Sequence, residues 1–191
     1  MKKILLSVAA LSSIFFLGSM MGNSAEPEKI ECTAMGTSTQ MGSLVSLQIT
    51  IDSFSTEEER QTLIQAFLKD KNAGISKALD KMPTRGRIQT PGTVGFELKF
   101  IRLLPNSPPG IRRIRIMTDR PISIIETRQQ SRSLDYSLSA VDLDLNDADS
   151  KKSKGTLLPL CEFKLDNKTK EFTVEARQFP FNLVNFIHRK K

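Results

Sequence analysis

Arginine is the residue whose placement most suggests a binding role in this sequence. Six arginines occur in the 22 residues from Ile111 to Arg132. Arg113 and Arg115 alternate with isoleucines, so in a strand they share one face, and Arg102 on the preceding strand completes the set if it faces the same way. Because planar guanidinium groups suit carboxylate, sulfate or phosphate, the three could form an anionic-ligand face. The favoured interpretation is a solvated sheet face on which nearby acids pair with the arginines.

A second group of residues has the chemistry of a carboxylate-dependent hydrolase. Asp119 and Arg120 stand in "TDRP", and Arg132, Asp135 and Tyr136 stand in "SRSLDY". Such residues can cleave a glycosidic bond only if they meet at a defined separation in a cleft. The alternative is a turn, in which the aspartate caps the backbone and the following proline fixes it.

No complete catalytic or cofactor motif accompanies these residues. His188 is the only histidine and lies three residues from the C-terminal Lys191. We predict it to be a strand-end or tail residue, because a catalytic histidine needs a buried carboxylate to orient it. One histidine and two distant cysteines do not make a usual zinc site. We therefore favour a non-catalytic protein and predict no cofactor.

A weak calcium candidate lies in "DLDLNDADSKKS". Asp142, Asp144 and Asn146 take the first, third and fifth positions of a calcium-binding loop. The pattern then fails, because Asp147 stands where glycine should make the turn and Ser153 where a bidentate glutamate belongs. A solvated strand end that runs into a polar loop is the favoured interpretation.

The two cysteines, Cys32 and Cys161, leave two alternatives open. An even number of cysteines in an exported chain is typical of a disulfide. The bridge requires that their strands lie side by side. Two buried free thiols are the other alternative.

Two amphipathic helices are predicted after the second strand. Ser55 and Glu58 form a capping-box pattern, and apolar residues follow at helical spacing. Asn72 and Gly74 interrupt this stripe, which resumes at Ile75 and ends before a proline. We expect both helices to pack on a sheet, with a glycine hinge between them.

The rest of the chain has the pattern of a β protein. Residues 44–52 alternate strictly between apolar and polar side chains, and 93–104 place Val94, Phe96, Leu98 and Phe100 on one face. Residues 135–146 alternate with a slip of phase, which is typical of a bulge. We predict a mainly β (α+β) fold: an antiparallel barrel or sandwich of about eight to ten strands.

The first 25 residues have the pattern of a secretory signal peptide. Two lysines precede an apolar run, and small residues follow, with cleavage expected after Ser24 or Ala25. The remainder, residues 26–191, has the length of a single β-rich domain. No later segment is apolar enough to span a bilayer. We therefore expect a secreted or periplasmic protein without a transmembrane segment once the signal is removed.

Several segments together resemble a family of small secreted bacterial proteins to which no activity is assigned. They are "ITIDSFSTEEE", "KALDKM", "MTDRPI", "SRSLDY", "VDLDLN" and "GTLLP". The resemblance covers roughly Ala34 to the end of the chain. It implies a single exported domain and supplies no catalytic residues.

The composition narrows the function further. The net charge is +7, with one Tyr and no Trp in the whole chain. Nucleic-acid binders usually add exposed aromatic side chains for stacking, so nucleic acid is not expected as a partner. We predict a non-catalytic binding or structural domain of the bacterial envelope. Its expected partner is an anionic envelope component or another envelope protein. The alternatives are the hydrolase and a small barrel that carries an apolar ligand.

Overall fold

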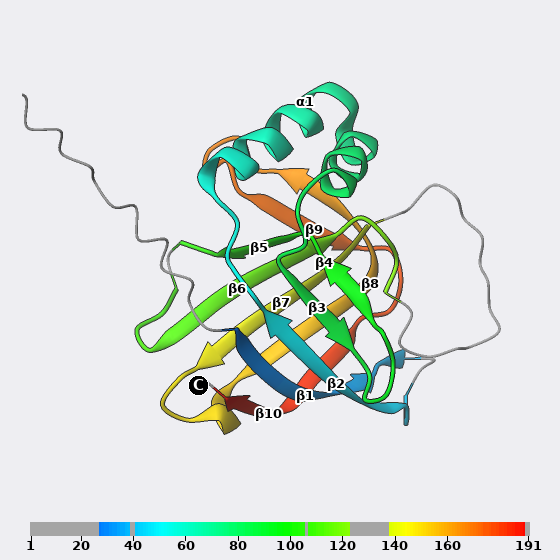
Figure 1. Ribbon diagram of the computed structural model, residues 1–191, viewed down its shortest axis with the longest axis vertical. Coiled ribbons are helices and arrows are strands. Elements are labelled where there is room, and N and C mark those ends of the chain that lie inside the picture. Colours follow the sequence, from blue (N-terminus) through cyan, green and yellow to red (C-terminus); the bar gives the residue numbers. More distant parts are fainter. Residues whose placement is uncertain (1–26, 39–40, 106, 123–137, 190–191) are drawn as a thin grey trace, which may run out of the picture.

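The computed structural model describes residues 27–38, 41–105, 107–122 and 138–189. Within these ranges the chain forms ten strands, one long helix and a 3-10 turn labelled η2 (Figure 1). In chain order the elements are β1 (Glu28–Gly36), β2 (Leu44–Ile51), α1 (Glu57–Asp80), β3 (Gly86–Gln89), β4 (Phe96–Leu98), β5 (Phe100–Leu103), β6 (Ile111–Thr118), β7 (Leu138–Asn146), η2 (Ser150–Lys152), β8 (Lys154–Leu165), β9 (Phe172–Ala176) and β10 (Phe181–Arg189).

Nine of these strands follow one another in a sheet that curls almost completely round. Their order is β4-β3-β2-β1-β10-β8-β7-β6-β5, and β9 pairs with β8 outside this path. All pairings are antiparallel. The two end strands, β4 and β5, are consecutive in the chain and only Lys99 separates them. The predicted mainly β, antiparallel fold is therefore confirmed, and its sheet is barrel-like and nearly closed.

The strand predicted over 93–104 is bent, and the bend closes the sheet. Its first half pairs with β3 and its second half with β6. Because of this bend, the apolar side chains that were predicted to share one face point to different sides of the sheet. Leu98 lies among the residues inside the barrel, whereas Phe100 lies in the cluster beneath the helix. Val94 precedes the strand and is 79% exposed, because the turn before β4 carries it into solvent.

The predicted pair of helices is not confirmed, because the segment forms one helix, α1, with an internal break. The backbone leaves helical geometry at Asp70 and Lys71, where Lys71 has φ 52° and ψ −136°. The break therefore comes before Gly74, the expected hinge, which lies in the second arm of α1. No helix in the described part of the chain is long and apolar enough to cross a membrane.

The start of α1 also differs by one residue from the prediction. Thr56, rather than Ser55, is the N-cap, and its capping box uses Glu59. Ser55 instead pairs with β5: its backbone N–H donates to the Ile101 carbonyl, and its hydroxyl accepts from the Ile101 N–H at 3.1 Å. The sequence offers two overlapping capping patterns, and the pairing with β5 selects the second.

Two apolar clusters lie on opposite faces of the sheet. The interior cluster fills the barrel and the outer cluster lies between the sheet and α1, which covers one end of the barrel in Figure 1. The predicted slip of phase corresponds to a register shift between Leu138 and Ala140, which pair with Cys161 and Leu158 of β8. After this bulge Val141, Leu143 and Leu145 enter the barrel. The bulge thus divides β7 between the two clusters.

Candidate functional site

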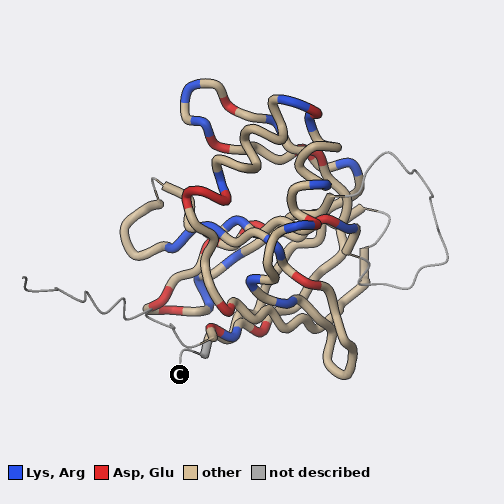
Figure 2. The backbone as a smooth tube through the Cα atoms, turned by 45° about the horizontal axis from the view of Figure 1, so that its top comes forward, with Lys and Arg blue, Asp and Glu red and all other residues tan. Residues whose placement is uncertain are grey.

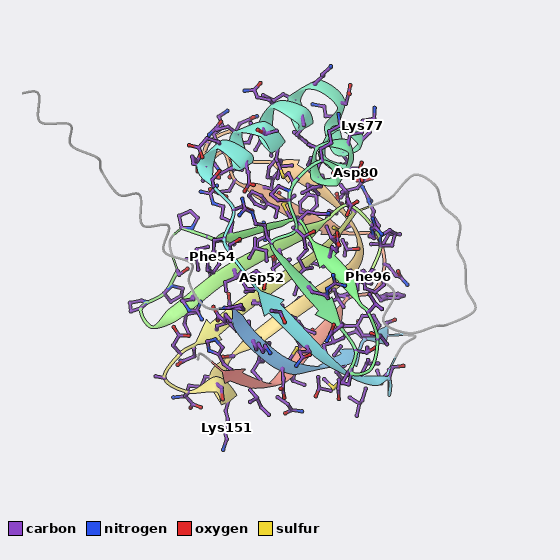
Figure 3. The ribbon with its side chains drawn as sticks, in the orientation of Figure 1. Asp52, Phe54, Lys77, Asp80, Phe96 and Lys151 are labelled. Carbon is purple, nitrogen blue, oxygen red and sulfur yellow. The ribbon has the colours of Figure 1, made fainter. Side chains whose placement is uncertain are left out.

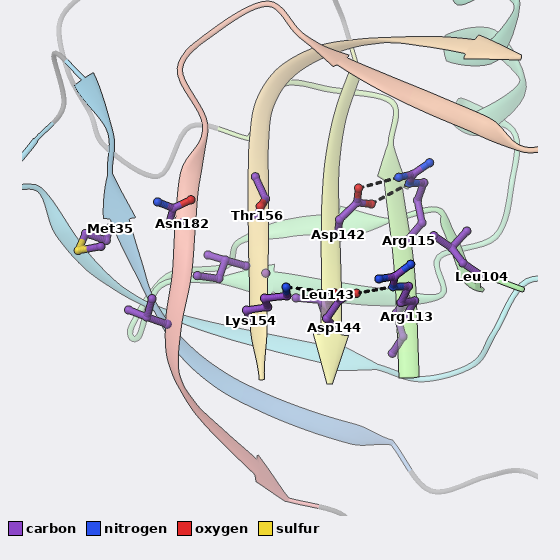
Figure 4. Close-up of a pocket in the computed structure, with 14 residues that line it drawn as sticks. Met35, Leu104, Arg113, Arg115, Asp142, Leu143, Asp144, Lys154, Thr156 and Asn182 are labelled. Atoms are coloured by element: carbon purple, nitrogen blue, oxygen red, sulfur yellow. Dashed lines mark hydrogen bonds and ion pairs between the residues drawn. The ribbon is translucent and has the colours of Figure 1, made fainter. Parts of the chain in front are cut away.

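A groove lies on the outer face of β6, β7, β8 and β10. Its volume is about 610 Å³. The strand register sets its side chains in a row, because Arg115 is opposite Asp142, Asp142 opposite Thr156, and Thr156 opposite Asn182. Figure 4 shows these side chains on one face of the neighbouring strands. We call this feature the sheet groove.

Ion pairs across neighbouring strands line the sheet groove. Arg115 donates two hydrogen bonds to Asp142, at 2.7 and 2.6 Å. Arg113 lies 3.2 Å from Asp144, and Lys154 lies 3.9 Å from the other oxygen of the same carboxylate. The Asp144 carboxylate is therefore shared by two cationic side chains, Arg113 and Lys154. Arg113 and Lys154 are 42% and 77% exposed, so this end of the sheet groove has an excess of accessible positive charge.

Arg102 does not line the sheet groove, although it is directly opposite Arg115 in the register. Its guanidinium group lies 3.1 Å from the Glu171 carboxylate on the turn between β8 and β9. Arg60 of α1 contacts the same oxygen of Glu171 at 3.3 Å and donates to the Lys170 carbonyl at 2.5 Å. Arg102 therefore helps to hold this hairpin against the barrel.

Arg115 takes part in both arrangements. Besides its two bonds to Asp142, it donates to the backbone carbonyl of Phe172, the first residue of β9. Arg60, Arg102 and Arg115 thus contact three consecutive residues of the chain, from Lys170 to Phe172. We call these three side chains the arginine clamp. Of the three arginines considered for an anionic-ligand face, only Arg113 remains accessible and outside the clamp.

The weak calcium candidate has its polar groups engaged elsewhere. Asp142 and Asp144 are paired with arginines, as described above. The side-chain oxygen of Asn146 accepts hydrogen bonds from the backbone of Ala148 and Asp149 in a tight turn. Among the described residues no group of three His, Cys, Asp or Glu is placed to hold a metal ion.

The hydrolase candidate can be placed only in part. Asp119 is nearly buried at the end of β6, and its carboxylate lies 3.6 Å from the exposed guanidinium group of Arg120. Neither residue is among those that line the sheet groove. Arg132, Asp135 and Tyr136 lie outside the described residues.

Cys32 and Cys161 are free and buried. Cys32 belongs to the interior cluster and Cys161 to the outer cluster. Their strands are not neighbours, because β10 lies between β1 and β8. The structure thus has the two free thiols and not the disulfide. Burial raises the pKa of each thiol to about 12.

His188 belongs to a polar cluster that the sequence did not suggest. Its side chain is 9% exposed, and its Nε2 lies against the carboxylate of Glu28. Arg112 donates two hydrogen bonds to Glu28, at 2.6 and 3.2 Å, and two to Asp147, at 2.8 and 2.9 Å. Burial acts to raise the pKa of Glu28, but Arg112 and His188 outweigh it and hold the pKa below its usual value.

This cluster joins the start of β1, the start of β6 and the end of β10 at one end of the barrel. In the sequence, Arg112 falls out of phase with the alternating Arg113 and Arg115. This irregular spacing was the only feature of the sequence that pointed to Arg112. Its partners could not be predicted, because Glu28 is 84 residues away in the chain. Both hydrogen bonds and charge thus fix the barrel end with residues that the sequence pattern could not bring together.

Comparison with known proteins adds no relative: no family model, no curated protein and no solved structure matches this chain. The resemblance to a family of small secreted proteins stays a prediction.

Proposed function

We propose that this chain is a non-catalytic binding protein of the bacterial envelope, and that the sheet groove takes an anionic ligand. The signal-peptide pattern of residues 1–25, which lie outside the described residues, motivates the location. The observation that carries the binding role is the shared carboxylate of Asp144, which faces both Arg113 and Lys154. Two positive charges face one negative charge there, so an anion that enters the sheet groove balances the second positive charge.

Differences among the arginines support this assignment. Arg115 makes three hydrogen bonds to Asp142 and the β9 backbone, and so has little capacity for a ligand. Within the described part of the chain, Arg113 pairs with one carboxylate, that of Asp144, which it shares with Lys154. Since an exposed ion pair contributes little to stability, a ligand can displace Asp144 from these two cations at small cost.

The shape of the barrel favours this outer site over an interior one. The interior cluster fills the space between the strands with branched and aromatic side chains, such as Ile30, Ile114 and Phe186. Small barrels hold an apolar ligand only when side chains leave room for it. The sheet groove, at about 610 Å³, is within the range of small-molecule sites.

Charge reversal tests the proposal. The double variant Arg113→Glu/Lys154→Glu should elute from a phosphocellulose column at clearly lower salt than the unaltered protein, because both accessible cations of the sheet groove are lost. The control Lys151→Glu/Lys152→Glu makes the same change of net charge on η2. Equal losses in the two variants would mean that overall charge, and not the sheet groove, causes retention.

A further inference from the structure

A second groove lies between the two arms of α1, beside the break. Its volume is about 440 Å³, and both arms of α1 line it. Ala66 of the first arm meets Gly74 of the second so closely that a Cβ on Gly74 would lie 2.0 Å from the Ala66 carbonyl oxygen. Ala78 and Met82 continue the apolar floor. We call this feature the helix groove.

Three lysines surround this apolar floor. Lys69 comes from the first arm, Lys77 from the second arm, and Lys81 is the C-cap residue of α1. None of them makes an ion pair with another described residue. Of the two acids that line the helix groove, Glu59 is held by Arg85 at 2.5 Å, which leaves Asp70 as the other carboxylate among the lining residues.

This arrangement differs from that of the sheet groove. There the cations lie beside carboxylates on the neighbouring strand, and Figure 2 shows acidic and basic residues interspersed over the strands. In the helix groove an apolar floor and unpaired ammonium groups occur together. A ligand that satisfies both must have an apolar body and a negative group at one end, because a purely polar anion leaves the floor uncovered.

We propose that the helix groove binds a single-chain amphiphile with an anionic head, such as an alkyl carboxylate. The chain lies on Ala66, Ala78 and Met82, and the head contacts Lys77 and Lys81, which are one helical turn apart. The volume fits a free small molecule, since such sites enclose roughly 300–1,000 Å³. This site does not rest on the function proposed for the sheet groove.

Calorimetric titration with decanoate, below the concentration at which it forms micelles, tests the proposal. Decanoate should bind to the full chain, while acetate and decanol should bind about tenfold more weakly or not at all. Lys77→Gln/Lys81→Gln should weaken decanoate binding by about tenfold. The control Lys151→Gln/Lys152→Gln changes the opposite end of the molecule, where Figure 3 labels Lys151 far from Lys77, and should leave binding unchanged.

Further variants and a vesicle experiment distinguish this site from its alternatives. Ala78→Phe fills the floor and should abolish decanoate binding while the thermal transition persists. Arg113→Glu/Lys154→Glu should bind decanoate normally, so failure at the sheet groove leaves this proposal standing. If decanoate bound to Lys77→Gln/Lys81→Gln as tightly as to the unaltered protein, the proposal would be wrong. Sedimentation with phosphatidylglycerol vesicles without binding of decanoate would also overturn it and would indicate a membrane-facing surface.

Discussion

Arg113 and Arg115 are two positions apart on one strand, yet their surroundings give them different roles. Arg115 bonds to Asp142 and to the backbone of β9, and it is mostly buried. Arg113 shares one carboxylate with Lys154 and is 42% exposed. The number of guanidinium donors already engaged therefore separates a residue that fixes the fold from one that is available to a ligand.

The Glu28 carboxylate offers a test at the same scale. Glu28→Gln should lower the free energy of unfolding at pH 7 by about 2 kcal/mol, because the hydrogen bonds from Arg112 lose their charged acceptor. The folded-state pKa of Glu28 lies below its usual value of 4.5. Its contribution is therefore complete above about pH 4.5 and is lost as the pH falls through the folded-state pKa.

Urea titrations at pH 7 and pH 3 measure this effect. The unaltered protein should lose more stability between these pH values than Glu28→Gln does. Asp80→Asn changes an exposed carboxylate at the end of α1, labelled in Figure 3, and serves as the control. The same loss in Glu28→Gln and in the unaltered protein would show that the ion pair with Arg112 contributes nothing to acid sensitivity.

At the scale of elements, the break in α1 positions a side chain that joins the helix to the sheet. Asn72 follows the break directly. Its side-chain amide accepts from the Phe163 N–H at 2.8 Å and donates to the Phe163 carbonyl at 3.2 Å. It thereby hydrogen-bonds to β8 as a neighbouring strand would. Asn72, which interrupts the apolar stripe in the sequence, therefore attaches the helix to the sheet.

Gly74 tests the contact between the two arms of α1. Gly74→Ala should lower the free energy of unfolding by roughly 1–3 kcal/mol, because the new Cβ collides with the Ala66 carbonyl. Helix propensity alone predicts the opposite sign. Guanidinium denaturation measures the difference. Ala73→Gly, at an exposed position of the same arm, should lose about 1 kcal/mol; a stabilised Gly74→Ala would show that the arms do not touch.

The sequence predicted individual elements better than their connections. Local alternation located β2, the segment that forms β4 and β5, and β7, because apolar periodicity is a local signal. It missed the bend at Lys99, since alternation continues through it. That bend depends on β3 and β6, which hold the two halves of the strand, and no pattern within residues 93–104 records these partners.

At the scale of the whole molecule, the two cysteines report on complete unfolding. They lie on opposite faces of the sheet, and burial raises the pKa of both thiols to about 12. In the unfolded chain these thiols recover a pKa near 9.0. From about pH 9 to pH 12 the unfolded state therefore binds fewer protons, and both thiols reduce stability as the pH rises.

Mass spectrometry of alkylated protein that a bacterial host has exported tests two predictions. The number of adducts reports the free thiols, and the intact mass reports whether the signal peptide has been removed. With iodoacetamide and no reductant, the folded protein should remain unmodified, whereas the denatured protein should gain two adducts. The intact mass should correspond to a chain that begins at Ala25 or Glu26. No adducts after denaturation would show that Cys32 and Cys161 form the disulfide, and a mass that includes the first 24 residues would contradict the signal peptide.

The candidate sites required the three-dimensional arrangement of the strands. Arg-x-Arg and Asp-x-Asp occur at strand spacing in residues 113–115 and 142–144, so two charged faces could be predicted. Which arginine meets which aspartate depends on the register of β6 with β7. Lys154, the helix groove and the cluster around His188 depend on contacts between distant segments, which hydrophobic periodicity does not encode.

The pairing of β1 with β10 has a consequence for the order of folding. β1, the first described strand, pairs with β2 and with β10, the last described strand. β10 also pairs with β8 and so connects β1 to β8 in the sheet. Until β10 is available, β1 and β8 each have an exposed edge, and the curled sheet remains two separate halves. Contacts of such high sequence separation slow folding. The curled sheet can therefore be completed only when nearly all of the chain, through β10, has been synthesised.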